Sequence, residues 1–109
     1  MPRGHGDQPP RTYVIDGHWP HATLHPDAPP GAHYAQEIAR RLAAAMTSLP
    51  TSARALAERA GISHPIIGRI LNGDGSTDIG TVARLEVTLN TRLYPDGLYR
   101  ELRTPTPDQ

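Results

Sequence analysis

Prolines and histidines are concentrated at the start of this chain, and they limit where a compact core can form. Of the 109 residues, the first 33 hold seven of the twelve prolines and five of the six histidines. Proline lacks the amide hydrogen that helices and strands use, so long regular elements are not expected there. The foldable part is therefore residues 34–103. A chain of about 70 residues buries only a marginal core by itself, which favours association with another subunit.

The composition excludes several classes of protein. The chain has no cysteine, which removes disulfide scaffolds, thiol nucleophiles and thiolate metal sites. No segment has the length and apolar character of a signal peptide or membrane span, so we expect a soluble cytoplasmic protein with no membrane partner. The net charge of zero argues against a protein that coats nucleic acid without selectivity. Segment 34–94 nevertheless carries seven arginines against five acids, which is compatible with a small specific site.

Residues 1–33 are expected to form an extension and linker, with residues 1–10 disordered because they have little to bury. The β-branched and aromatic residues 11–15 predict a strand, and Asp16-Gly17 is a signal for a tight turn. The second strand of this hairpin would be an edge strand, because Pro20 has no donor for a ladder. Alternatively, the first strand pairs with the weakly alternating segment 94–102, at the start of the carboxy-terminal tail, residues 95–109.

From residue 34 the apolar spacing becomes helical, and it predicts an all-α, compact domain of four to five helices over residues 34–94. The first helix ends at Pro50 and buries one stripe, and the second, residues 53–60, follows a hydroxyl cap at Ser52. The third covers residues 63–72, and the fourth starts after Asp78. The expected buried stripes of the first and fourth helices are Ile38, Leu42, Ala45, Met46 and Leu49, and Ile79, Val82, Leu85 and Leu89.

Residues 52–73 form the most informative stretch of the sequence. Two short helices meet there across a three-residue turn, where Gly61 permits the reversal, Ile62 anchors it and Ile67 packs on the preceding helix. A polar face remains on the later helix, and an α-helix of that width fits the major groove of DNA. This exposed face consists of His64, Pro65, Gly68, Arg69 and Asn72.

Over residues 34–94 the chain resembles the phage-repressor (Cro and XRE-like) helix-turn-helix regulators. The resemblance rests on Leu56-Ala57, Gly61-Ile62-Ser63, Ile67, Arg69 to Gly73, Thr81 to Leu85, and Leu89-Asn90. It implies a compact helical domain whose third helix recognises operator DNA, commonly as a dimer. Two departures concern the DNA-facing parts: Ala53 stands where the family often has glutamine, and Asp74 and Asp78 replace a loop that is often basic.

The candidate site follows from this reading. Arg69 is the leading base reader, because a guanidinium can bond a guanine edge in two places. Ile66 either touches a thymine methyl or packs in the core, and Gly68 either lets the backbone approach DNA or merely weakens the helix. Asn72 either contacts a phosphate or only stops the helix. The candidate base contacts are Arg69, His64, Pro65, Ile66 and Gly68, and the candidate phosphate contacts are Ser52, Ala53, Arg54, Asn72, Ser76 and Thr77.

Other chemistries are less well supported. His18, His21 and His25, with Asp16 or His33, have ligand-like spacing but span a proline and a linker, so no metal site and no cofactor is expected. Segment 72–78 lacks the acid that a calcium loop requires. No nucleophile elbow, phosphate loop or carboxylate pair is present, which argues against an enzyme. Arg3 and Arg11 lie where a basic arm could reach a minor groove, but two charges alone favour a disordered tail over such an arm.

The sequence therefore predicts a regulator of transcription, a repressor, that binds specific double-stranded DNA as a homodimer. The alternative is an antitoxin-like or adaptor module that uses the same helices to bind a protein such as a toxin. Two features, the neutral total charge and the acidic loop, slightly favour this alternative, but the regulator remains the main prediction.

Overall fold

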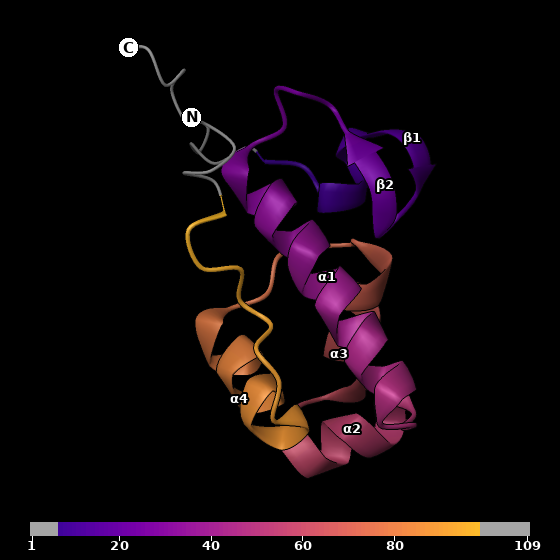
Figure 1. The fold of residues 1–109 in the computed structure, drawn as a ribbon, viewed down its shortest axis with the longest axis vertical. Coiled ribbons are helices and arrows are strands. Elements are labelled where there is room, and N and C mark those ends of the chain that lie inside the picture. The colour runs from indigo at the N-terminus through magenta and orange to yellow at the C-terminus, as the bar shows by residue number, and fades with distance from the viewer. Residues whose placement is uncertain (1–6, 99–109) are drawn as a thin grey trace.

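The computed structural model describes residues 7–98 of the chain, which form a helical body with a small β-hairpin packed on one end (Figure 1). The two-stranded antiparallel sheet makes the label all-α too narrow, although the helical domain and the presence of an amino-terminal hairpin agree with the prediction. The predicted strand over residues 11–15 is wrong in its bounds, because residues 11–13 belong to a 3-10 helix and the strand begins at Val14. The elements are the 3-10 helix η1 (Pro10–Tyr13), strands β1 (Val14–His18) and β2 (His21–Leu24), and helices α1 (Pro30–Ser48), α2 (Ala53–Ala60), α3 (His64–Asn72) and α4 (Ile79–Leu89).

Helix α1 is the long element against which the hairpin and α3 pack. It begins at Pro30, four residues before the position from which the apolar spacing indicated a helix, because proline suits the first turn. Of the predicted stripe, Ile38, Leu42 and Ala45 are buried. Leu49 was wrongly placed in that stripe: it is 52% exposed, since the helix has already ended at Ser48.

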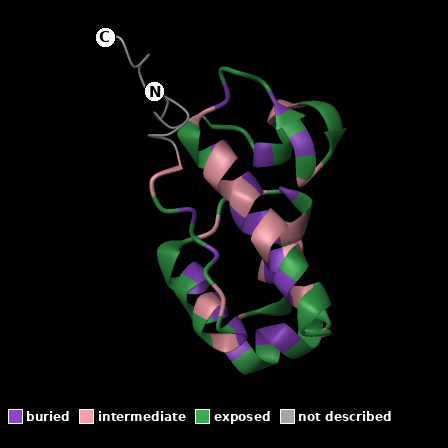
Figure 2. Ribbon diagram, in the orientation of Figure 1, coloured by how far each residue is buried: buried purple, intermediate pink, exposed green. Residues whose placement is uncertain are grey.

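The core lies between the four α-helices, whose buried positions face inward (Figure 2). Helix α4 contributes Val82, Leu85 and Leu89, as predicted. Ile79 was also predicted to be buried, yet it is 79% exposed. It lies about a quarter of a turn away from the centre of the buried stripe. The largest fully buried side chains are Leu42, Leu56, Ile67, Leu85, Leu89 and Leu93.

The hairpin turns at Trp19-Pro20, and the prediction of a turn at Asp16-Gly17 was wrong. Asp16 pairs with Thr23 inside the ladder, and an irregularity in the register lies between Val14 and Asp16. Gly17 has a φ of +84°, and a Cβ there would lie 3.0 Å from the carbonyl oxygen of His21. This glycine therefore serves a close approach of the two strands.

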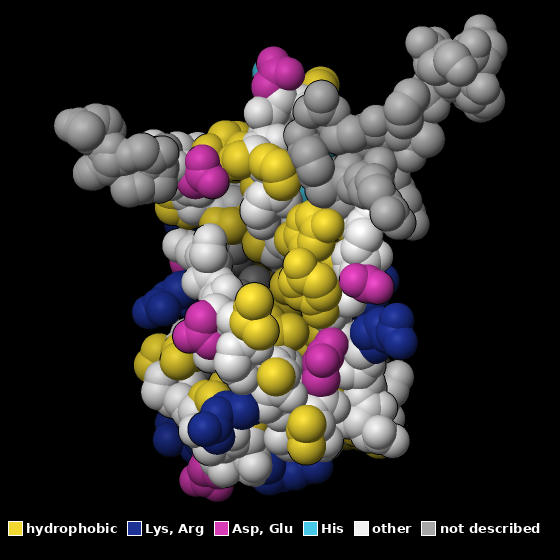
Figure 3. All heavy atoms as spheres, turned by 90° about the vertical axis from the view of Figure 1, so that its left-hand side faces the viewer, with side chains coloured by type: hydrophobic (Ala, Val, Ile, Leu, Met, Phe, Trp, Pro, Cys, Tyr) yellow, Lys and Arg dark blue, Asp and Glu magenta, His cyan; other side chains and the backbone are white. Residues whose placement is uncertain are grey.

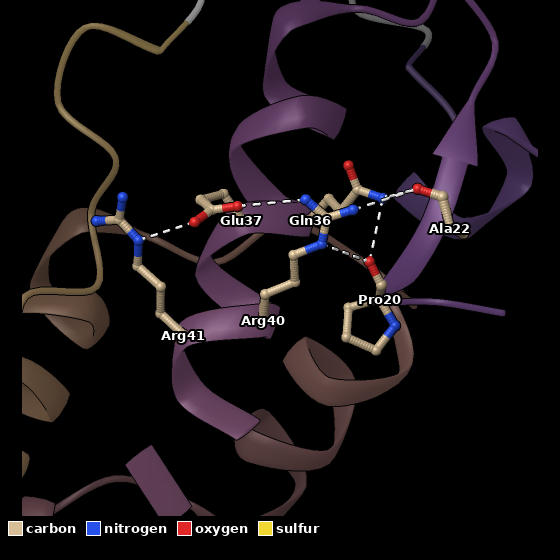
Figure 4. Close-up of polar contacts among 6 residues, drawn as sticks. All are labelled: Pro20, Ala22, Gln36, Glu37, Arg40 and Arg41. Atoms are coloured by element: carbon tan, nitrogen blue, oxygen red, sulfur yellow. Dashed lines mark hydrogen bonds and ion pairs between the residues drawn. The ribbon is translucent and has the colours of Figure 1, made fainter. Parts of the chain in front are cut away.

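Side chains of α1 hold the hairpin in place (Figure 4). The buried Gln36 amide donates hydrogen bonds to the carbonyl oxygens of Pro20, at 3.1 Å, and Ala22, at 2.5 Å. The Arg40 Nε also donates to the Pro20 carbonyl, at 3.0 Å. Glu37 accepts from Arg40 and Arg41, at 3.4 and 3.0 Å. The carbonyl groups near the turn thus find donors that a two-stranded ladder alone cannot supply.

Two hydrophobic clusters meet at the hairpin. The smaller one consists of Leu24, Ala28 and Ala32, with Tyr13 and Val14 packed on it. The half-buried Trp19 packs against both this cluster and the helical core. The hairpin is therefore part of the folded body.

At both ends of the chain, the described residues depart from the sequence predictions. Of the predicted disordered segment 1–10, residues 1–6 lie outside the described residues, whereas Pro10 is buried and opens η1. Within the described part, β1 pairs only with β2, and no strand occurs between residues 91 and 98. The rest of the segment proposed to pair with β1, residues 99–102, lies outside the described residues, as does the remaining tail to residue 109. No helix within residues 7–98 is long and apolar enough to cross a membrane.

The segment after α4 is fixed by one carboxylate. Glu86 accepts hydrogen bonds from the amides of Leu93, at 2.7 Å, and Tyr94, at 2.9 Å. The bonds from Tyr94 and Leu93 hold the pKa of Glu86 below its ordinary value. The ionised form of Glu86 is therefore the one that favours folding.

Replacing Glu86 by glutamine is expected to lower the melting temperature by a few degrees at pH 7, because the amide accepts these bonds more weakly. The Glu86 contribution is complete above the unfolded pKa of about 4.3 and disappears as the pH falls through the lowered folded value. The difference between wild type and Glu86→Gln should thus shrink at pH 3, as measured by circular dichroism melts. Glu58→Gln, on the exposed surface of α2, is the matched control. A difference that stays constant with pH would contradict the assignment.

Candidate nucleic-acid interface

Helices α2 and α3 form a helix-turn-helix unit whose ends are set by local interactions. The Ser52 hydroxyl caps α2 by accepting a hydrogen bond from the Ala55 amide, at 3.0 Å. Gly61 ends α2 with a φ of +73°, and the amide of Ile62 bonds back to the Ala57 carbonyl, at 3.0 Å. This is the six-to-one bond of a helix that ends in a left-handed glycine. The bounds of α2 and its end at Gly61 agree with the sequence prediction.

The two helices pack through small and branched side chains. Leu56 and Ala57 on α2 and Ile67 on α3 are all buried in the same core cluster. Ile62, predicted to anchor the turn, is half-buried against that cluster. Ser63 occupies the cap position of α3, but its side chain forms no capping hydrogen bond. The packing thus fixes how α3 is rotated about its own axis.

The outward face of α3 carries most of the predicted base contacts. His64, Pro65, Arg69 and Asn72 are exposed, and Gly68 is half-buried with open space where a Cβ would stand. Ile66 is half-buried and packs on the core cluster, which supports its packing role. A face free of core contacts is available to a ligand.

The loop after α3 brings two of the predicted phosphate contacts beside Arg69. Ser76 and Thr77 line a small cavity of about 70 Å³ together with Ile66 and Arg69. A Cβ on Gly75 would lie 3.1 Å from the Arg69 Cδ, so the arginine stem runs along this glycine. The structure therefore brings Arg69, Ser76 and Thr77 together.

The other predicted phosphate contacts lie separately. Ser52, Ala53 and Arg54 occupy the start of α2, where the first amide groups of a helix lack partners within it. Arg54 is exposed, and no hydrogen bond or ion pair with another residue of segment 7–98 holds its side chain. Asn72 is the last residue of α3, directly before Gly73, which has a φ of +70°. The helix thus ends at Gly73, and the exposed Asn72 side chain is also accessible to a phosphate, so the structure is compatible with both roles considered for Asn72.

The carboxy-terminal end of α3 is covered by the amino-terminal extension, which sequence reasoning missed. A Cβ on Gly73 would lie 2.6 Å from two ring atoms of Trp19. The Trp19 Nε1 lies 3.4 Å from the Ile70 carbonyl oxygen, and the Arg11 amide donates to the Gly73 carbonyl, at 3.0 Å. Arg11 is therefore docked, which corrects the expectation that it belongs to a free arm; Arg3 lies outside the described residues.

Both acids of the loop have partners. Asp74 forms an ion pair with Arg11, with 2.8 Å between carboxylate and guanidinium. Asp78 caps α4 by accepting a hydrogen bond from the Thr81 amide, at 2.7 Å, and this bond lowers the pKa of Asp78. The acidic loop thus has one neutralised carboxylate and one committed to a helix cap.

The histidines of the extension do not assemble into a ligand set in the described part of the chain. No three histidine or acidic side chains of residues 7–98 lie close enough to share a metal ion. The His25 Nδ1 accepts a hydrogen bond from the Asp27 amide, at 3.0 Å. Burial lowers the pKa of His33, which favours its neutral form.

Two helices joined by a tight turn, with one face of the second left open, define a helix-turn-helix protein. A family model described as helix-turn-helix matches residues 42–94. Residues 42–94 thus match the Cro and XRE-like helix-turn-helix family, which consists of DNA-binding regulator domains and is not an enzyme family. The match begins inside α1 and leaves out the hairpin. No curated protein and no solved structure matches the chain.

Substitution by alanine should have opposite effects on stability at Gly68, within α3, and at Gly73, which follows its last residue. Gly73→Ala places a Cβ against Trp19 in a left-handed conformation, and we expect it to cost about 2 kcal/mol or more of unfolding free energy. Gly68→Ala meets open space within a helix and should stabilise by up to about 1 kcal/mol. Urea unfolding measures both. Equal effects of the two substitutions would contradict the structure around Gly73.

Proposed function

We propose that the protein is a transcriptional regulator, a repressor, that binds specific double-stranded DNA with α3 in the major groove. The observation that carries this proposal is the open face of α3 within a segment that matches the helix-turn-helix family. A bound regulator of this kind occupies its operator and excludes other proteins from it. The proposed place of action is the cytoplasm, together with the DNA that the protein binds.

Base reading is assigned to the residues that α3 exposes. Arg69 is the principal reader, supported by its exposure and by the Gly75 backbone along its stem. His64 and Pro65 stand at the amino-terminal end of α3, which is the end that helix-turn-helix proteins direct at base edges. Gly68, with open space where a Cβ would stand, allows close approach of the backbone, whereas the half-buried Ile66 has its main role in packing on the core. Phosphates are bound at the start of α2 by Ser52, Ala53 and Arg54, and beyond α3 by Asn72, Ser76 and Thr77.

The charge of the protein limits how it binds. The total charge is zero, so counterion release from nonspecific DNA is small. Discrimination then depends on a few direct contacts and on the pairing of two subunits. This favours a regulator that leaves nonspecific DNA readily.

Arg69→Ala and Arg54→Ala should separate base reading from phosphate binding. Selection from a random pool of duplexes by the wild-type protein supplies the operator, and the symmetry of the recovered sequence reports the subunit arrangement. Arg69→Ala should lose roughly 1–3 kcal/mol of operator binding and relax the preference at one base pair. Arg54→Ala should weaken operator and scrambled duplex alike and flatten the salt dependence.

Fluorescence anisotropy titrations at several salt concentrations measure these differences. Ala44→Ser, on the exposed surface of α1, is a control that should leave both affinities unchanged. Failure of the wild-type protein to enrich any duplex would reject the proposed function.

A homodimer is supported by an apolar stripe on α4. Ile79, Ala83 and Val87 are exposed and spaced four residues apart, so they share one face of the helix. Figure 3 shows hydrophobic side chains gathered along the middle of the face that carries α4, with charged side chains mostly to either side. The partly exposed Tyr94 follows α4 and lies 5.5 Å from Tyr34, ring centre to ring centre. We assign this stripe to the second subunit; dimers of helix-turn-helix proteins read two half-sites about 34 Å apart along DNA.

The double substitution Ile79→Glu with Val87→Glu should convert the dimer into a monomer. Both side chains are about 80% exposed, so the change does not disturb the core of the subunit. Sedimentation velocity gives the mass. Ile15→Glu, which places the same charge on the exposed surface of β1, should leave the dimer intact. Loss of the dimer with Ile15→Glu alone would assign the interface to the hairpin, and a monomeric wild type would favour a different protein, such as a toxin, as the partner of this stripe.

A further inference from the structure

We propose that Arg11, from the extension outside the family match, is a positioning residue for DNA binding: it holds Asp74 away from the phosphates while the extension braces the end of α3. The inference rests on the proposed function, because it assigns a role at the same DNA-binding surface. Arg11 itself contacts no DNA in this proposal. Its effect passes through Asp74 and Gly73.

Arg11 is attached to the end of α3 by its backbone and by its side chain. Its amide donates to the Gly73 carbonyl, at 3.0 Å, and its guanidinium lies 2.8 Å from the Asp74 carboxylate. Its Cβ would lie 3.0 Å from a Cβ on Gly73, so the two chain segments are in close contact. Two ring atoms of Trp19 lie 2.6 Å from the same Cβ position of this glycine. The extension therefore fixes the position where α3 ends and the loop begins.

The position of Asp74 explains why its charge matters. It lies between Asn72 on one side and Ser76 and Thr77 on the other, three residues assigned to phosphates. An unpaired carboxylate among phosphate-binding groups would repel the DNA backbone, and a surface charge acts over about 8 Å at physiological salt. A carboxylate held by a guanidinium presents little net charge. The ion pair thus makes the loop compatible with DNA.

The exposure of the pair separates this role from a structural one. Arg11 and Asp74 are 59% and 39% exposed, and an ion pair of this kind adds little to the free energy of unfolding. The extension is held to the body independently by Gln36, Arg40 and Trp19. Removing the pair should therefore leave the fold intact and change the DNA-facing loop.

A double-mutant cycle tests the inference on the duplex that the wild-type protein selects from a random pool. Arg11→Gln should weaken binding by about two- to tenfold, whereas Arg11→Lys, which keeps the ion pair, should bind like wild type. Asp74→Asn should bind at least as tightly as wild type. The combination of Arg11→Gln with Asp74→Asn should bind like Asp74→Asn alone. Melting temperatures should remain close to that of wild type throughout.

The matched control is Arg59→Gln, which removes the same charge from an arginine on α2 whose guanidinium bonds to the Thr88 carbonyl. Its effect should be the same with Asp74 and with Asn at that position. If Arg11→Gln behaves in this additive way, Arg11 contacts a phosphate directly and the inference is wrong. An unchanged affinity in Arg11→Gln would also overturn it.

Hydrogen exchange tests the bracing role without DNA. The Asp74 amide bonds to the Arg69 carbonyl, at 3.0 Å, and the Gly73 amide to the Ile70 carbonyl, at 3.2 Å. The Asp74 amide should exchange faster in Arg11→Gln than in wild type or Arg11→Lys, because the ion pair no longer holds Asp74, whereas the Gly73 amide is still braced by the backbone of residue 11 and by Trp19. Unchanged exchange would reject the inference even if the protein binds DNA. If instead no duplex is selected but exchange changes as expected, the proposed function is wrong, whereas the stabilisation of the end of α3 by Arg11 is confirmed.

Discussion

The packing of Trp19 connects the two parts of this structure. Its indole lies against the small cluster under the hairpin and against the helical core, and it covers the glycine that ends α3. Because the hairpin turns at Trp19-Pro20, the indole reaches the core. This ring also explains why position 73 must be glycine, because both the left-handed conformation and the ring leave no space for a Cβ. The end of α3 is therefore fixed by tertiary contact as well as by its own cap.

The parts of the fold that depend on local signals were predictable from the sequence, and the parts that depend on distant contacts were not. The bounds of α2 follow from the Ser52 cap and Gly61, which act within a few residues. The turn of the hairpin was misplaced because Asp16-Gly17 has the stronger local signal, whereas Gln36, Arg40 and Trp19 decide the matter through side chains far along the chain. The open face of α3 followed from helical periodicity. The pairing of Arg11 with Asp74 had no sequence signal, because nothing local links the two residues.

The helix-turn-helix unit separates stability from recognition at the level of single residues. On α3, Ile67 and Ile70 are buried in the core, while His64, Arg69 and Asn72 take no part in it. Left-handed glycines at positions 61 and 73 bracket the helix, so its length and rotation are set by residues that face away from a ligand. The exposed side chains can therefore vary with the sequence that is read, while the scaffold that presents them stays the same.

The hydrogen bond between Trp19 and Ile70 spans 51 positions of sequence, and this has a consequence for how the chain is assembled. Closing so long a loop is entropically costly until the helices that fill it have formed. During synthesis the hairpin leaves the ribosome well before α3 exists, so the indole has no core to enter at that stage. The hairpin can dock on α1 through Gln36 and Arg40 before α3 is made, but the end of α3 acquires its final shape only when it meets the indole.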